Sequence, residues 1–214
     1  SLGEAIKSKI VLLAEFTGDT EDEALEKARV AQTSLRGLKL NSTTITRDRE
    51  DANKYWTIRR ESFNLLRHHS GHDRTAPIIE DVIVRPEFLP EFLPRLYAIL
   101  DSYHLKYTIA GHIGDGNLHI MPLMNFHKSK VCDIALELCE KVFTLVLEYH
   151  GSISAEHNDG LIRTPFLKKM YSPEIITLFE ETKRIFDPQN IFNPGKKVFG
   201  KELPFIKEHI DRFY

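Results

Sequence analysis

The stretch that decides the fold is a glycine-rich turn between two apolar segments, Gly111-His112-Ile113-Gly114-Asp115-Gly116-Asn117-Leu118-His119. Residues 106–110 before it and 118–123 within and after it have the composition of strands. The glycines permit positive φ angles and Asp-Gly is a strong turn signal, so the stretch predicts an antiparallel hairpin. Such a hairpin brings His112 and His119 face to face, where two imidazoles could bind one ion.

A second polar stretch, Ser154-Ala155-Glu156-His157-Asn158-Asp159-Gly160, supplies a carboxylate and a third imidazole. With His112 and His119, Glu156 completes a set of two histidines and one carboxylate, which suits zinc, manganese or iron. His157 beside it could act as a general base near neutral pH. The alternative is a tight turn with incidental histidines, an acid at a helix N-terminus and a surface histidine. The joint occurrence favours the metal site.

Three arginines are further candidates for binding an anion. Arg59 and Arg60 follow Trp56 on a predicted helix, and a guanidinium there could form a fork with a substrate carboxylate. Arg163 follows the Asp159-Gly160 turn and could also bind an anion. In each case the alternative is a solvated helix face.

Composition narrows the function classes. The chain has 214 residues, a net charge of −2 and 42% hydrophobic residues, typical of a globular protein with a substantial core. Without a basic tract, a nucleic-acid partner is not expected. No apolar run reaches the length of a membrane-spanning helix. Cys132 and Cys139 lie about 10 Å apart on a predicted helix, too far for a disulfide, so buried reduced thiols and a cytoplasmic location are expected.

The predicted elements mix strands with helices. Strands are predicted at residues 10–16, 42–46, 78–84, 106–110 and 118–123, with a short extended piece at 151–154; helices are predicted at 20–35, 49–66, 86–103, 128–149 and 173–186. One hairpin is clear, so the order favours an α+β fold with helices on one face of a mainly antiparallel sheet. The stretch His68-His69-x-x-His72 falls in a polar segment, 68–77, predicted to be a mobile solvated loop.

Three motifs together resemble the C-terminal region of the FAD-linked oxidoreductases, the group of D-lactate dehydrogenase, the glycolate oxidase flavin subunit and D-2-hydroxyglutarate dehydrogenase. They are residues 111–119, the run Ser152-Ile153-Ser154-Ala155-Glu156-His157, and Phe186-Asp187-Pro188 continuing to Asn193-Pro194-Gly195-Lys196. Trp56-x-x-Arg59 is similar to a fourth motif of this family. Together they extend over nearly the whole chain.

The resemblance implies a duplicated ferredoxin-like cap domain over residues 1–200, followed by a tail at 201–214. It also implies roles for individual residues. His112, His119 and Glu156 match metal ligands, His157 the base, Arg59 a substrate-carboxylate binder, Asn117 a polar group facing the substrate, and Asn193 the turn that approaches the flavin.

The implied reaction is oxidation of a small D-2-hydroxy acid to a 2-oxo acid, with hydride transfer to FAD and then to an electron acceptor. The FAD would come from a preceding domain of the same parent protein, so this chain by itself is expected to bind little flavin and not to turn over. A dimer and a peripheral membrane association of the parent enzyme both stay open. The alternatives are a non-catalytic metal- or partner-binding module that keeps the cap fold, and a metal-dependent hydrolase.

Two positions depart from the family pattern. Asn158 stands where glycine is common, and asparagine tolerates the left-handed geometry of that turn. Ile79, two residues before Asp81, stands where some relatives carry a substrate-binding lysine. A dicarboxylate such as 2-hydroxyglutarate would therefore lack one anchor.

Overall fold

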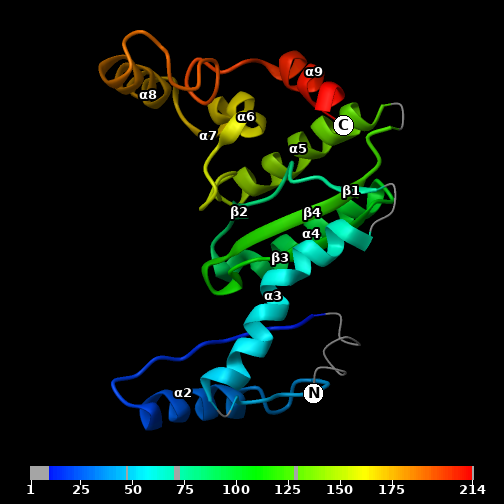
Figure 1. Cartoon of the computed structure of the whole chain (residues 1–214), viewed down its shortest axis with the longest axis vertical. Helices are drawn as coiled ribbons and strands as arrows, with labels where there is room; N and C mark the ends of the chain where they lie inside the picture. The colour runs from blue at the N-terminus through cyan, green and yellow to red at the C-terminus, as the bar shows by residue number, and fades with distance from the viewer. Residues whose placement is uncertain (1–9, 47, 70–72, 128–129, 214) are drawn as a thin grey trace. The chain divides into compact units, whose positions relative to one another are not determined.

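The structure is a computed structural model in which residues 10–46, 48–69, 73–127 and 130–213 are described (Figure 1). The chain divides into two compact units, Ser1–Leu65 and Leu66–Tyr214. His112, His119, Glu156 and His157 all belong to the second unit.

The first unit contains helix α2, Glu21–Ser34. Helix α3, Arg49–His69, begins in the first unit and ends in the second, because the two units divide after Leu65. The Thr20 hydroxyl caps α2 by accepting the backbone N–H of Glu23 at 3.2 Å. Three acidic residues in its first turn stabilise the helix, because their negative charges lie near the positive end of the helix dipole. After α2, Gly37 takes a φ of +98°, the left-handed conformation that ends many helices. The predicted start and end of α2 are therefore confirmed.

The two strands predicted for this unit are wrong. Neither residues 10–16 nor residues 42–46 have a strand assignment in the structure, and Ile10 and Leu12 are 73% and 70% exposed. A strand exists only where its backbone groups meet a ladder partner, and an apolar run does not supply that partner by its own composition.

The second unit is built on one antiparallel sheet whose central strand is β4, Asn117–Met124 (Figure 1). Strand β3, Lys106–Ala110, pairs along one edge, from Lys106 opposite Leu123 to Ala110 opposite His119. Two short strands share the other edge: β1, Arg74–Thr75, and β2, Val82–Ile83. The predicted hairpin and the α+β class are confirmed, while the duplicated ferredoxin-like arrangement stays a prediction. Of the predicted strand 78–84, only β2 forms.

Helices cover the sheet and enclose the core. The short 3-10 helix η1, Pro86–Phe88, leads into α4, Leu89–Ser102, and α4 packs against α5, Val131–Glu148. The core contains fully buried side chains from both helices, including Phe92, Leu96, Leu100, Leu138 and Phe143. Burying each such side chain stabilises the fold by about 1.5–3 kcal/mol.

Alternation along β4 separates the core from the site. Leu118, Ile120 and Met124 belong to the core cluster. Successive side chains point to opposite faces of a strand, so Asn117 and His119 lie on the other face. Both are still buried, at 4% exposure each. The hairpin therefore presents a polar pair on the face away from the main core.

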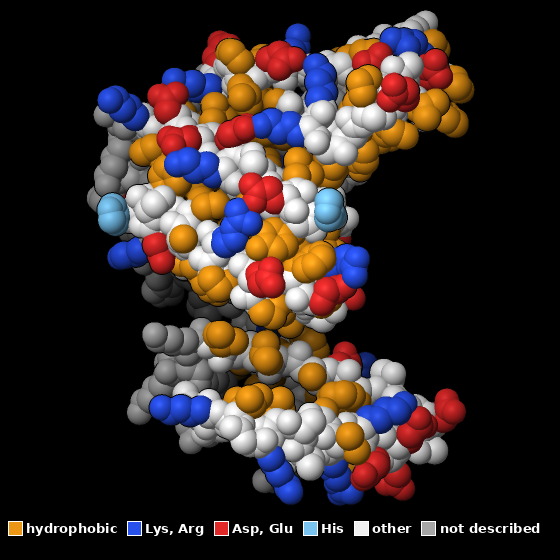
Figure 2. Space-filling view, turned by 180° about the vertical axis from the view of Figure 1, so that it is seen from behind, with side chains coloured by type: hydrophobic (Ala, Val, Ile, Leu, Met, Phe, Trp, Pro, Cys, Tyr) orange, Lys and Arg blue, Asp and Glu red, His pale blue; other side chains and the backbone are white. Residues whose placement is uncertain are grey.

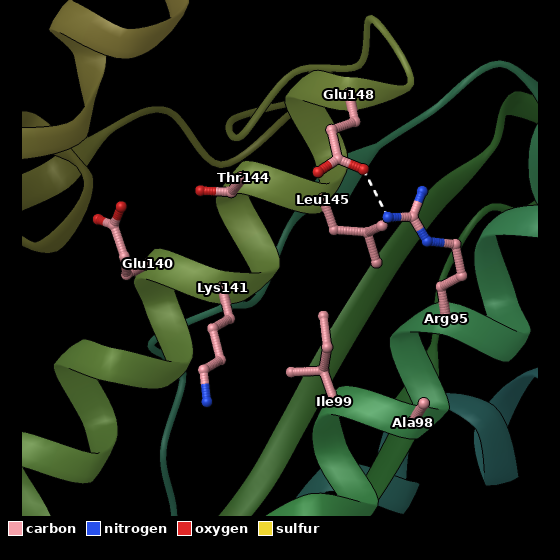
Figure 3. Close-up of a pocket in the computed structure, with 8 residues that line it drawn as sticks. All are labelled: Arg95, Ala98, Ile99, Glu140, Lys141, Thr144, Leu145 and Glu148. Carbon is pink, nitrogen blue, oxygen red and sulfur yellow. Dashed lines mark hydrogen bonds and ion pairs between the residues drawn. The ribbon is translucent and has the colours of Figure 1, made fainter.

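The outward faces of α4 and α5 form a groove of about 390 Å³ (Figure 3). Arg95 on α4 reaches Glu148 on α5, with Nη2 and Oε2 2.6 Å apart. The groove is also lined by Ala98 and Ile99 of α4 and by Lys141 and Leu145 of α5. An exposed ion pair of this kind contributes about 0–1 kcal/mol. The residues that line this groove include none of the predicted site residues.

The C-terminal region contains the short segments α6, Gly160–Arg163, η3, Thr164–Phe166, and α7, Leu167–Met170, and then α8, Pro173–Phe186. Helix α8 has no buried residue, and hydrophobic side chains gather on its surface and on the segment after it (Figure 2). Among them, Phe186 and Phe192 are 80% and 66% exposed. A final helix, α9, Leu203–Phe213, was not predicted; it packs on α5 and buries Ile206.

Both cysteines lie on α5 and are buried, as predicted. The Cys139 thiol contacts the Ile78 carbonyl oxygen at 3.4 Å, and burial raises its pKa to about 12. This thiol is therefore held as an unreactive core side chain. Among the helices in the described part of the chain, none is both long and apolar enough to cross a bilayer.

Gly116 provides the test of the hairpin. Its φ is +76°, and a β-carbon there would lie 1.7 Å from the Val84 carbonyl oxygen. Gly116→Ala should therefore lower the free energy of unfolding by about 3 kcal/mol, because left-handed strain adds to a backbone clash. Urea unfolding followed by circular dichroism measures the change.

Gly114 in the same turn is the matched control. A β-carbon there meets nothing within 4 Å, so Gly114→Ala should stay within about 0.5 kcal/mol of the parent chain. Equal stability of the two variants would contradict the turn geometry described here.

Candidate metal and acid–base site

The candidate site lies where the β3–β4 hairpin meets the loop that precedes α6. His112 comes directly before the 3-10 turn η2, Ile113–Asp115, and His119 lies on β4. Glu156 and His157 follow Ser152, which forms a β-bridge with Ile83 of β2. The sheet therefore brings together two polar stretches that lie far apart in the sequence.

Asp81 holds the second stretch in place. Its side chain is fully buried, and its carboxylate accepts the backbone N–H groups of Ala155, Glu156 and His157 at 3.0, 3.0 and 2.8 Å. The side-chain amide of Asn117 donates a fourth hydrogen bond at 3.0 Å. Burial by itself would raise the pKa of Asp81, but these hydrogen bonds outweigh it and lower the pKa. The carboxylate thus joins β4 to the loop.

Three imidazoles converge on one carboxylate oxygen. The Nε2 atoms of His112, His119 and His157 lie 3.2, 3.1 and 3.4 Å from Oε1 of Glu156. Donor atoms around a tetrahedral ion with bonds of about 2.1 Å are about 3.4 Å apart. The spacing and the mixture of imidazole nitrogen and carboxylate oxygen therefore fit a divalent metal ion. The predicted set His112, His119 and Glu156 is brought together.

Asp81 also lies within 4.8 Å of ligand-type atoms of His119, Glu156 and His157. Proximity does not make it a ligand, because its two oxygens already accept hydrogen bonds from three backbone N–H groups and one amide. Its chemistry is that of an anchor.

Glu80 lies on the other side of two of the histidines. Its Oε1 is 3.1 Å from Nδ1 of His119 and also contacts Nδ1 of His157, while its Oε2 is 3.2 Å from Nη2 of Arg163. Burial would raise the pKa of Glu80, but these three cationic or hydrogen-bonding neighbours lower it. In return, the contact with Glu80 raises the pKa of His119 against the effect of burial.

Two predicted substrate-binding residues lie inside the protein. Arg163 is 5% exposed, and its guanidinium donates to the Asn158 carbonyl at 2.7 Å and contacts Glu80. Asn117 is 4% exposed, and its amide nitrogen is engaged by Asp81. In this structure both side chains support the loop, and direct contact with substrate stays a prediction.

The other predicted residues lie away from this cluster in sequence. Arg59 lies on α3 in the first unit, and its role stays a prediction. Asn193 takes a left-handed φ of 48° in a turn that closes through the Lys196 N–H. His68 and His69 fall within α3 instead of the predicted loop, whereas His72 lies outside the described residues.

Glu80 and Asp81 were not among the predicted site residues. Both acids interrupt an apolar run, Ile78-Ile79-Glu80-Asp81-Val82, and Ile79 and Val82 are fully buried. Charged residues inside a buried segment require partners, because an unpaired buried charge is costly. That pattern was the available signal, and it would have marked both residues.

Comparison with known proteins identifies the family. Residues 4–197 match the model of the family "FAD linked oxidases, C-terminal domain". This match extends over most of the chain, and the chain belongs to this family.

Relatives of known function carry related names. The chain is 30% identical to the D-2-hydroxyglutarate dehydrogenase of Pseudomonas putida over 190 residues, which is 86% of this chain and 18% of that protein. It is 30% identical to the D-lactate dehydrogenase of Archaeoglobus fulgidus over 83% of this chain and 37% of the relative. It is 26% identical to the glycolate oxidase subunit GlcD of Bacillus subtilis over 94% of this chain and 42% of the relative. The chain thus spans less than half the length of these relatives.

The anchoring role of Asp81 can be tested with an isosteric change. Asp81→Asn keeps the shape and tolerates the residue's φ of 66°, but it replaces one acceptor oxygen by a donor that faces backbone N–H groups. We expect a loss of at least about 2 kcal/mol in the free energy of unfolding, since a buried donor without an acceptor costs about 1–3 kcal/mol. Hydrogen exchange of residues 154–158 should accelerate as well.

The exposed acid of η2 serves as the control for this change. Asp115→Asn should leave both measurements close to those of the parent chain. Unchanged exchange in Asp81→Asn would show that the loop is held by other contacts.

Asp187 gives the turn before Asn193 a defined pH dependence. Its buried carboxylate accepts the N–H groups of Ile191 and Phe192 at 2.9 Å each and pairs with Lys183. Burial opposes ionisation, but these contacts lower the pKa of Asp187. The turn is therefore stabilised above the unfolded value of about 3.9 and loses that stabilisation as the pH falls through the lower folded value.

Hydrogen exchange of the Ile191 and Phe192 amides, normalised to intrinsic rates, measures this loss. Protection should be constant above about pH 5 and should decline below about pH 4. Asp187→Asn should show weak protection at every pH. Protection that persists in that variant would contradict the capping role.

Proposed function

We propose that this chain is the substrate- and metal-binding domain of a flavin-dependent dehydrogenase that oxidises a D-2-hydroxy acid to a 2-oxo acid. The observation that carries the proposal is the convergence of three imidazole Nε2 atoms on Glu156. Membership in the family of FAD-linked oxidases supports the part of the proposal that concerns oxidation by a flavin. The names of the relatives in that family agree in naming hydroxy-acid oxidation.

His112, His119 and Glu156 would hold a divalent ion such as zinc, manganese or iron. Bound there, the ion would lower the pKa of the substrate's 2-hydroxyl group. Two of these ligands are half-exposed, with side-chain exposures of 50% for His112 and 48% for Glu156, so a small molecule can reach them. The side chain of His119 is buried, and it would provide a ligand whose position the surrounding protein fixes.

His157 is proposed as the general base. Its side chain is 48% exposed and its Nε2 lies 3.4 Å from the same Glu156 oxygen, which puts the ring beside the ligand set and within reach of substrate. A neutral imidazole there can take the hydroxyl proton while the C2 hydride leaves for the flavin. Arg59 is proposed to orient the substrate carboxylate.

A small monocarboxylate suits the charges of this site better than a dicarboxylate. Glu80, Asp81 and Glu156 are acidic, and the guanidinium of Arg163 is already paired with Glu80. Ile79 is fully buried and offers no charge for a second carboxylate. We therefore propose a substrate of the size of lactate or glycolate in preference to 2-hydroxyglutarate.

The partner of this domain is proposed to be the flavin-binding domain of the parent protein, in the cytoplasm. The exposed hydrophobic side chains of α8 and of the segment after it support this, because an apolar surface of that kind favours a protein interface. The surface includes Leu178, Ile185, Phe186, Ile191 and Phe192. The turn at Asn193 follows it directly, and the proposal assigns that turn to the flavin side.

The test is reduction of the flavin in the parent protein, which contains this domain together with its flavin-binding domain. We expect D-lactate or glycolate, added anaerobically, to bleach the flavin absorption band, and D-2-hydroxyglutarate to bleach it more slowly. His157→Ala should slow bleaching by about 100-fold or more, since general-base catalysis contributes about 10²–10⁴.

His127→Ala is the matched control, because His127 is an exposed histidine outside the cluster, and it should bleach at the parent rate. A parent protein that carries no flavin would refute the dehydrogenase. Bleaching by none of the three acids would leave the family membership standing and refute the substrate class.

A further inference from the structure

We infer that Glu80 is a positioning residue that fixes the ring orientation of both His119 and His157. The inference rests on the proposed function in one respect, because it concerns the same metal site. It adds a residue that holds the ligand His119 and the base His157 through one carboxylate oxygen. Glu80 itself touches neither the substrate nor the metal in this assignment.

The contacts are arranged symmetrically around the two rings. On one side, Oε1 of Glu80 contacts Nδ1 of both His119 and His157. On the other side, Oε1 of Glu156 lies 3.1 and 3.4 Å from their Nε2 atoms. The rings are stacked and parallel, with centroids 4.9 Å apart and planes 6° apart. Each ring therefore spans the same two carboxylate oxygens.

A bound ion would decide where the ring hydrogen lies, because both nitrogens of each ring face a carboxylate oxygen. An ion held by Nε2 of His119 needs the lone pair of that atom, so the hydrogen of the neutral ring is then on Nδ1. Glu80 is the acceptor that faces this nitrogen. The same Glu80 oxygen contacts Nδ1 of His157, so one side chain orients the proposed ligand and the proposed base together.

Arg163 explains how a carboxylate can occupy this position. The Glu80 side chain is only 12% exposed, and an unpaired charge there would be strongly unfavourable. Arg163, itself buried, contacts both the carboxylate and the backbone carbonyl of Glu80 and donates to the carbonyl of Asn158. The guanidinium thus ties Glu80 to the loop that carries His157.

Glu80 and Asp81 position different parts of the site. Asp81 fixes the backbone of Glu156 and His157, and Glu80 fixes the side chains of His119 and His157. Asp81 adopts a left-handed φ of 66°, and these two consecutive acids position different parts of the same site.

The first measurement is metal affinity, with Zn²⁺ and Mn²⁺ titrated into the 214-residue chain by calorimetry. Glu80→Gln keeps the size of the side chain and removes its charge. We expect it to weaken binding by about 10–100-fold, the usual effect of losing the group that orients a metal-binding histidine. Glu181→Gln, the same change at an exposed position of α8, should bind as the parent does.

The second measurement is the state of each ring, read from the ¹⁵N chemical shifts of the chain loaded with Zn²⁺. In the parent, Nδ1 of His119 should carry the ring hydrogen, and the Nδ1 signals of both His119 and His157 should move in Glu80→Gln. A purely structural role for Glu80 would change the unfolding midpoint but not the ring signals of a folded variant.

The outcomes separate this inference from the proposed function. Unchanged metal affinity and unchanged ring signals in folded Glu80→Gln would overturn the role of Glu80 and leave the metal site standing. If the parent binds neither ion, the proposed metal set fails, and the Nδ1 signals of the two rings, compared between the metal-free parent and Glu80→Gln, still decide whether Glu80 positions them. If Glu80→Gln does not fold, Glu80→Asp, which keeps the charge and shortens the side chain, is measured in its place with the same expectations.

Discussion

The site depends on one interaction, the capture of three consecutive backbone N–H groups by the buried carboxylate of Asp81. The loop that contains Glu156 and His157 has no helix or strand of its own, so its amides need partners from elsewhere. Asp81 supplies them, and through Asn117 it joins the loop to β4. The register of β4 then determines where His119 lies relative to Glu156. In this way sheet pairing and ligand geometry are linked through one side chain.

Charge balance gives the site its second constraint. Glu80, Asp81 and Glu156 bring three carboxylates into a small region, and the guanidinium of Arg163 pairs with one of them, Glu80. Protonated histidines can offset part of the excess negative charge, as the raised pKa of His119 indicates. A divalent cation at the imidazole ligands would offset it more completely. The same excess disfavours a substrate with a second negative charge near these acids.

The sequence predicted those parts of the fold that local rules determine. The helix at Glu21–Ser34 has a cap and a glycine stop, and the β3–β4 hairpin has the turn residues that such a connection requires. The sequence motifs also pointed to His112, His119 and Glu156, which the structure brings together, and metal binding by these residues stays a prediction. In contrast, the strands at 10–16 and 42–46 were wrong, because strand formation depends on a distant partner. Glu80, Asp81 and the internal position of Arg163 could not be read from spacing, since their roles come from contacts across more than 70 residues of sequence.

The proposed metal site is tested most directly by locating a bound ion with anomalous X-ray diffraction from crystals grown with Mn²⁺. We expect one strong anomalous peak within bonding distance of the Nε2 atoms of His112 and His119 and of a Glu156 oxygen. We also expect the Asp81 carboxylate to keep its backbone hydrogen bonds and not to bind the ion. A peak coordinated by Asp81, a peak away from the hairpin, or no peak in this region at saturating Mn²⁺ would contradict the proposed site.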